Sequence, residues 1–216
     1  MKINKIWAAL LALIMLAALA ACAADGADVK QSENEFKFMQ SESGQIRQAD
    51  IDYLKRCMLE NGPDDEFDDI EALTALAVMR AVVWEAEELG LAESLDEVRE
   101  KMTVRYQEFA AAAADESNPE HDMAVWIIDY AQKMKQQVPM TDDDYLDYTA
   151  LNQQVTDAYT KLQERFEADL PPEVREDVWL KVEALQEYIK SLLEKYHDEL
   201  VEPELLPLLD EILKNM

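Results

Sequence analysis

Apolar residues recur along most of this chain at the three- and four-residue spacing of amphipathic helices. Glycine occurs only four times, and the prolines fall between the periodic segments, where helices are expected to end. The pattern predicts helices over about 48–60, 65–89, 94–114, 117–139, 141–166, 178–196 and 203–215. A weak alternation over 35–40 allows at most one short N-terminal strand. We therefore expect an all-α fold.

Two helix boundaries carry specific signals. Gly90 suits the left-handed position that commonly follows the end of a helix. Ser94 and Glu97 have the spacing of a capping box, in which each side chain accepts a hydrogen bond from the backbone amide of the other residue. Together they predict that one helix ends just before Gly90 and that the next begins at Ser94.

The segment 178–196 carries an unbroken apolar stripe at alternating four- and three-residue spacing. Its members are Val178, Val182, Leu185, Ile189, Leu192 and Tyr196. We expect this helix to form an antiparallel hairpin with the helix over 141–166. A stripe that is covered within the chain predicts a monomer, whereas an exposed stripe predicts a dimer or a complex with a partner.

The N-terminus has the pattern of a bacterial export signal that ends in a lipid-modified cysteine. Two lysines precede an uncharged run over 6–21, which is shorter than the roughly 20 apolar residues of a membrane span. The run ends in Leu19-Ala20-Ala21-Cys22, which resembles the lipobox of bacterial lipoproteins. We expect Cys22 to receive a diacylglyceryl group and to anchor the protein at the extracytoplasmic face of the cell membrane. The alternative is an ordinary export signal followed by a chance cysteine.

The expected organisation has four parts. Residues 1–21 are the signal peptide, and 22–35 are the lipidated cysteine and a tether of small or polar residues. Residues 36–168 form a helical domain, and 169–216 are C-terminal helices that pack on the same domain. The tether can stretch to roughly 45 Å, so the folded part can stand clear of the lipid surface.

The chain is strongly acidic, with a formal net charge of −27 at pH 7. Removal of residues 1–21 would take away two lysines and no acid. Such a charge argues against binding to nucleic acid or to anionic lipid headgroups through a basic patch, and it permits attraction to basic partners. The expected partners are the membrane, through the lipid anchor, and polypeptides.

Sequence motifs of catalysis and cofactor binding are not found. Glu194 and His197 have the spacing of one half of a di-iron motif, but a second such pair does not occur. The acidic runs over 64–69 and 142–144 lack the glycine and the distal glutamate of a calcium loop, and we interpret them as helix starts. Cys57 is interpreted as a packed core thiol, with a reactive thiol as the alternative. We expect no enzyme activity, no metal and no cofactor.

Methionine and aromatic side chains are the candidates for binding a polypeptide, because flexible thioethers suit surfaces that accept varied apolar partners. The candidates are Met79, Trp84, Met102, Tyr106, Phe109, Trp126 and Met134. The same residues at helical spacing also fit a helical core. The sequence leaves open whether they line a groove or fill the core.

Residues 44–98 and 141–166 resemble the N-terminal chaperone domain of SurA-type and PrsA-type extracytoplasmic folding factors. The likeness is strongest over 84–98, where Trp-Glu-Ala-Glu-Glu-Leu-Gly-Leu is followed by the capped sequence Ser-Leu-Asp-Glu-Val. The segment 44–51 is similar to the family's strand, turn and helix opening, and 141–145 is similar to the capped start of its later helix.

The chain departs from the family pattern in three ways. Glu93 stands where the family usually has an apolar residue, and the segment 103–140 has no counterpart. Conversely, the parvulin isomerase domain of the family has no counterpart in this sequence. The resemblance therefore implies binding of unfolded or extended polypeptide and gives no support to prolyl isomerisation. The first hypothesis is a membrane-anchored chaperone-like protein, and the alternative is a structural or adaptor lipoprotein that binds one fixed partner through its helical faces.

Overall fold

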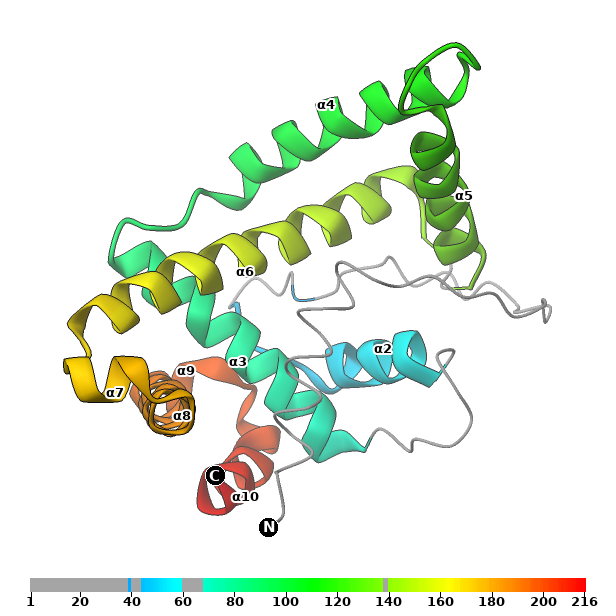
Figure 1. The fold of residues 1–216 in the computed structure, drawn as a ribbon. Coiled ribbons are helices and arrows are strands. Elements are labelled where there is room, and N and C mark those ends of the chain that lie inside the picture. Colours follow the sequence, from blue (N-terminus) through cyan, green and yellow to red (C-terminus); the bar gives the residue numbers. More distant parts are fainter. Residues whose placement is uncertain (1–38, 40–43, 60–67, 138–139) are drawn as a thin grey trace. The chain divides into compact units, whose positions relative to one another are not determined.

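The computed structural model describes residues 39, 44–59, 68–137 and 140–216, apart from the side chains of 56–59 and 137 (Figure 1). These residues confirm the all-α fold class. The helices are α2 (Gln48–Leu59), α3 (Asp69–Glu88), α4 (Leu95–Ala113), α5 (His121–Gln137), α6 (Asp142–Asp169), α7 (Pro172–Glu176), α8 (Val178–Lys195), α9 (His197–Leu200), the 3-10 helix η1 (Pro203–Leu205) and α10 (Leu206–Asn215). None of the described helices is both long enough and apolar enough to cross a membrane.

The described residues form two compact units. Unit 1 contains 39–93 and 154–216, and unit 2 contains 94–153. Helix α6 begins in unit 2 and ends in unit 1. Unit 2 is therefore a segment inserted between the two parts of unit 1 along the chain.

Helix α3 is the centre of unit 1. It is buried on almost every side, and helices α2, α8, α9 and α10 all pack against it. A helix that is apolar all round is stable only when other elements cover all of its faces, and the run Ala72–Val78 has that character. Burial of these side chains is the main source of stability for the unit.

Local signals in the sequence fix the two ends of α3. Asp68 accepts a hydrogen bond from the Glu71 amide at 2.8 Å, and Glu71 accepts one from the Asp68 amide, so a capping box begins the helix at Asp69 rather than at residue 65. At the other end, Gly90 adopts a φ of +65°. The amides of Gly90 and Leu91 donate to the carbonyls of Glu87 and Ala86, which satisfies the last turn as a Schellman motif does.

The start and the end of unit 1 are joined through backbone hydrogen bonds. Ile46 donates to the Leu200 carbonyl at 2.8 Å, and its own carbonyl accepts from Glu202 at 3.0 Å, which makes an isolated parallel bridge with Val201. Just beyond, the buried carboxylate of Asp50 accepts from the Arg47 guanidinium and from the Arg47 amide. A buried charge needs such partners, and here they fix the entry into α2.

The relation of α6 to α8 differs from the expected antiparallel hairpin. Figure 1 shows α8 almost end on where α6 lies across the view, so the two helices cross instead of running alongside each other. They meet where the rings of Phe166 and Tyr188 stack with centroids 4.9 Å apart. The short helix α7 between them turns the chain, and α8 packs instead on α3.

Several predictions from the sequence fall on residues outside the described ranges. These are the signal over 1–21, the lipid site Cys22, the tether and the weak strand over 35–40, of which only Met39 is described. Cys57 lies within α2, but its side chain is not among those described. These predictions stay as they were.

Candidate functional site

Helices α4 and α5 pack closely in unit 2. Buried alanines, among them Ala112 on α4 and Ala124 and Ala131 on α5, keep this part of the unit compact. Asn118 orders the turn between the helices, since its side chain accepts from the Glu120 amide at 2.8 Å and its carbonyl accepts from His121 at 3.0 Å. The close packing of α4 on α5 therefore fixes the positions of the larger side chains that these two helices carry.

The apolar side of α4 is only partly covered. Met102, Tyr106 and Phe109 follow each other at helical spacing and are all half-buried, while Val98 and Ala112 are the buried residues of this helix. A stripe of this kind on a core helix is normally buried along its length. Helix α4 therefore presents methionine and aromatic surface to solvent.

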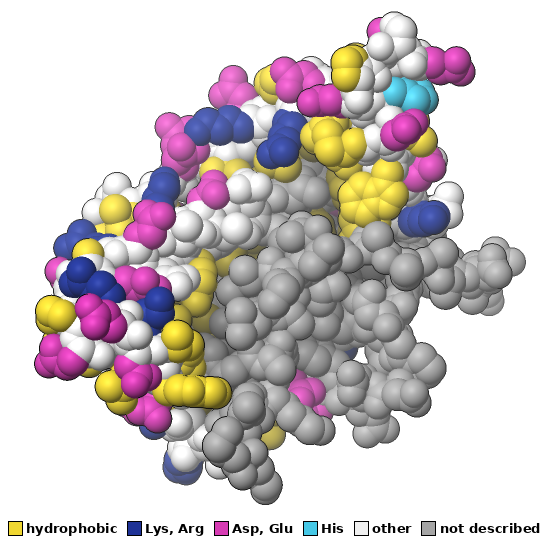
Figure 2. All heavy atoms as spheres, in the orientation of Figure 1, with side chains coloured by type: hydrophobic (Ala, Val, Ile, Leu, Met, Phe, Trp, Pro, Cys, Tyr) yellow, Lys and Arg dark blue, Asp and Glu magenta, His cyan; other side chains and the backbone are white. Residues whose placement is uncertain are grey.

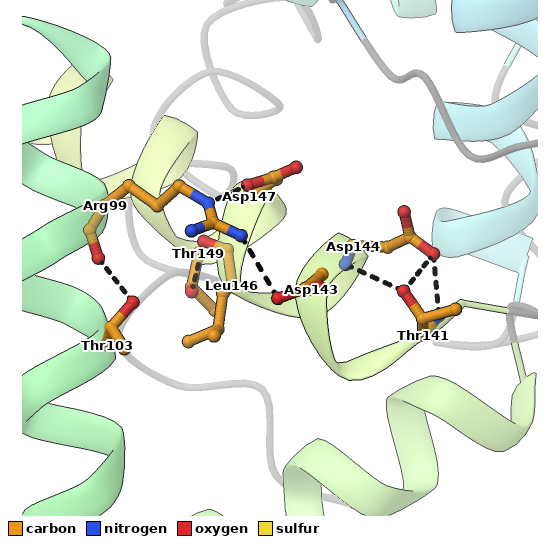
Figure 3. Close-up of polar contacts among 8 residues, drawn as sticks. All are labelled: Arg99, Thr103, Thr141, Asp143, Asp144, Leu146, Asp147 and Thr149. Carbon is orange, nitrogen blue, oxygen red and sulfur yellow. Dashed lines mark hydrogen bonds and ion pairs between the residues drawn. The ribbon is translucent and has the colours of Figure 1, made fainter.

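Arg99 ties α4 to the first turns of α6 (Figure 3). Its guanidinium forms an ion pair with Asp147 and a second one with Asp143 at 3.2 Å. The hydrogen bond and charge of Asp147 are the main reason that the pKa of Arg99 is raised. The start of α6 is itself capped, because the Thr141 hydroxyl accepts from the Asp144 amide at 3.2 Å and the Asp144 carboxylate accepts from the Thr141 amide at 2.7 Å.

A cluster of rings surrounds Tyr145 within unit 2. The Tyr106 ring lies 5.8 Å from the Tyr145 ring, and the Lys135 ammonium lies 5.9 Å from the same ring. Burial raises the pKa of Tyr145, so its hydroxyl stays protonated at neutral pH. A hydrogen bond to Asp142, 2.5 Å long, raises the pKa of Lys135. The cluster therefore presents the uncharged phenol of Tyr145 and the protonated ammonium of Lys135 for contact with a ligand.

Trp126 is the most exposed of the seven predicted binding residues. Its side chain is 47% exposed and stacks on Tyr130, four residues along α5, with centroids 5.9 Å apart. Met123, one turn earlier, and Val104 on α4 are also exposed. Figure 2 shows hydrophobic side chains at the surface of this pair of helices. The exposed indole is held in place by its neighbour and is available to a ligand.

The structure divides the predicted binding residues between the two units. Five of them, Met102, Tyr106, Phe109, Trp126 and Met134, belong to unit 2, whereas Met79 and Trp84 belong to unit 1. None of the seven is fully buried.

The ring of Trp84 packs against other side chains of unit 1. It meets the Tyr196 ring edge on at 5.5 Å and the Arg80 guanidinium at 5.8 Å. A Cβ at Gly44, where φ is +74°, would approach the indole to 3.3 Å. These contacts make Trp84 a packing residue of unit 1 and leave the exposed residues of unit 2 as the stronger candidates for binding a polypeptide.

A second exposed apolar surface lies at the start of α8 and was not among the predicted binding residues. Its members are Val178, Trp179, Leu180 and Val182, which we call the α8 apolar end. The only signal for it in the sequence was the heptad stripe, whose first two residues belong to it. The sequence did not indicate which part of that stripe would be covered.

His197 belongs to a small polar cluster between α9 and α10. Its ring nitrogens contact Asp198 at 2.7 Å and Asp210 at 3.0 Å, and Glu194 is exposed. The hydrogen bond with Asp198 is the largest cause of the raised pKa of His197. Among the residues that the structure describes, no three His, Cys, Asp or Glu side chains are grouped to hold a metal ion.

Comparisons of this chain with protein-family models, with curated proteins and with solved structures found no match.

Proposed function

We propose that this protein is a non-enzymatic, chaperone-like lipoprotein that binds unfolded or extended polypeptide at the extracytoplasmic face of the cell membrane. The observation that carries the proposal is the exposed Trp126 on α5 together with the half-covered apolar stripe of α4, the helix that packs on α5. An exposed methionine and aromatic surface on a soluble unit usually marks a binding surface.

The composition of this surface favours a polypeptide ligand. Aromatic rings supply large contact areas with little loss of conformational entropy, and methionine adapts to differently shaped apolar groups. The acidic chain adds long-range attraction for basic clients and keeps the protein soluble. The lipid at Cys22 would hold unit 2 near the place where exported chains emerge.

The proposal is tested by the aggregation of a chemically unfolded client protein. The mature chain, residues 22–216 with Cys22→Ser so that it is made without lipid, should slow aggregation in proportion to its concentration. Trp126→Ala should remove most of this effect. Trp179→Ala is the matched control, because it truncates an exposed tryptophan in unit 1, and it should behave as the parent. No effect of the parent on any client would refute the proposal.

A second candidate function is an adaptor that binds one fixed protein partner. A specific observation favours it: the heptad stripe of α8 is buried at Ile189, Leu192 and Tyr196 but exposed at Val178 and Val182. A stripe that continues past the elements that cover it is an incomplete helix interface.

A further inference from the structure

The exposed apolar residues of the described part are unevenly distributed. Seven large hydrophobic side chains are exposed there, and four of them form the α8 apolar end within five consecutive positions. Val178 and Trp179 are 66% and 65% exposed, more than any of the others. Single exposed apolar residues are common, but adjoining ones such as Val178, Trp179 and Val182, which include a tryptophan, are typical of an interaction surface.

The α8 apolar end continues a helix interface that is already used inside the chain. The four- and three-residue spacing places Val178 and Val182 on the same side of α8 as Ile189, Leu192 and Tyr196. The C-terminal half of that side is buried in unit 1, where α8 packs on α3 and α10, and Val182 at the other half is 39% exposed. A partner helix with the same spacing can continue the interface along the exposed half.

Acidic side chains outnumber basic ones around the α8 apolar end. Glu173, Glu176 and Glu183 are exposed and have no ion-pair partner among the described residues. Glu183 follows Trp179 by four residues and so lies beside it on the helix. The rim of the surface is therefore negative.

The two cations nearest to this surface are already engaged. Arg175 donates to the carbonyls of Ala168 and Leu170, both at 2.9 Å, and Lys181 lies 3.4 Å from Glu167. Both cations hold the end of α6 in place, and neither forms an ion pair with a glutamate of the rim. Asp177 is also engaged, since it caps α8 by accepting from the Trp179 amide at 2.8 Å.

We infer that the α8 apolar end docks a basic amphipathic helix of a protein partner. This inference rests on the second candidate function proposed above and names its surface and the chemistry of its partner. Apolar residues of the partner at the same spacing contact Trp179, Val178 and Val182. Lysine or arginine residues at the edges of the partner helix pair with the rim glutamates, which gives both specificity and fast association.

Charge separates this partner from the two other possible occupants. A second copy of this chain would bring an identical acidic rim against the first, and like charges in contact oppose association. Anionic lipid headgroups would likewise be repelled by the rim glutamates. A basic helix is the occupant that satisfies both the apolar centre and the acidic edge.

The test uses fluorescence polarisation of a labelled model peptide with the mature chain. The probe is a peptide about two heptads long with leucine at the alternating spacing and lysine elsewhere, and its control carries glutamate in place of lysine. The lysine peptide should bind at least about tenfold more tightly than the glutamate peptide. Trp179→Ala should weaken binding by about tenfold or more, as truncation of an interface tryptophan does. Glu183→Gln should weaken binding less and reduce its salt dependence.

The control variant is Ser191→Ala, at an exposed position of α8 outside the apolar end, which should bind the lysine peptide as the parent does. Circular dichroism should show unchanged helix content in the Trp179→Ala variant, because the side chain is exposed.

Equal binding of the two peptides, no binding of either, or a loss of binding in Trp126→Ala but not in Trp179→Ala would overturn the inference. A dimer by light scattering, or binding to anionic vesicles, that Trp179→Ala abolishes would replace the partner helix by a second copy or by the membrane. Failure of the client assay leaves this result unaffected, since that assay depends on Trp126.

Discussion

The hydroxyl of Tyr196 donates a hydrogen bond to Oε2 of Glu85, 2.9 Å away, and fixes the end of α8 on α3. Lys195 reinforces this contact, since its ammonium lies 2.5 Å from Glu85 and 2.6 Å from Glu88. Burial is the main reason that the pKa of Tyr196 is raised to about 12, so the phenol remains a donor at every physiological pH. The C-terminal half of α8 is held at this point, whereas its N-terminal half carries the exposed apolar end.

Removal of this hydroxyl tests the contact. Tyr196→Phe keeps the ring against Trp84 and removes one donor, so we expect the free energy of unfolding to fall by about 1 kcal/mol. The matched control is Tyr188→Phe, because the Tyr188 ring stacks on Phe166 and its hydroxyl has no hydrogen bond among the described residues. Urea denaturation followed by circular dichroism measures both variants. An equal loss in the two variants would contradict the assignment.

Two Leu→Ala substitutions on α8 test whether its C-terminal half is buried and its N-terminal end is exposed. Leu192 is buried on the stripe and Leu180 is exposed at the α8 apolar end. Leu192→Ala should cost about 2–5 kcal/mol of stability, because it removes buried apolar surface and leaves a cavity. Leu180→Ala should change stability by less than about 0.5 kcal/mol. Similar losses in thermal or urea unfolding would show that both halves of α8 are covered.

The contact of His197 with Asp198 and Asp210 predicts a pH dependence. Because the pKa of His197 is raised in the folded state, protonation stabilises the fold. This contribution is complete below the ordinary histidine pKa of about 6.5 and is lost as the pH rises through the folded-state pKa. Between about pH 6 and pH 8, the wild type should therefore lose more stability than His197→Asn does. An NMR titration that placed the pKa of His197 at or below the ordinary value would contradict this prediction.

The proposed lipid anchor at Cys22 has a direct chemical test. Cells that express the full chain and are fed labelled palmitate should incorporate the label, and the protein should fractionate with membranes. Cys22→Ser should abolish the labelling and release the protein from the membrane fraction, since the remaining chain would lack acyl chains. Label retained in the Cys22→Ser variant, or no label in the wild type, would show that Cys22 is not the anchor.

Structural features that depend on a few neighbouring residues could be predicted from the sequence. The capping box of Ser94 and Glu97 formed as expected, and so did the left-handed turn at Gly90. The start of α3 was placed too early because every acid in the run over 64–69 suits a helix start. Asp68 is the cap because it is the acid that lies three residues before a glutamate able to return the bond.

Features that depend on distant contacts could not be predicted. Trp84 packs against Tyr196, which lies more than a hundred residues along the chain, and sequence periodicity carries no information on such a pairing. The heptad stripe predicted a helix interface, but which half would be covered depends on where α3 and α10 lie. The exposed Trp126 was selected as a candidate from its residue type alone, and its exposure could be learned only from the fold.

Photo-crosslinking in intact cells tests most directly the claim that the exposed apolar end of α8 docks a polypeptide. A photoreactive amino acid is placed at position 179 of the lipidated protein and, as the control, at Ser191, which is exposed elsewhere on the same helix. We predict that position 179 gives a discrete adduct with a polypeptide that carries a basic amphipathic helix and that position 191 gives none. Adducts that are the same from both positions, or no adduct from either, would contradict it.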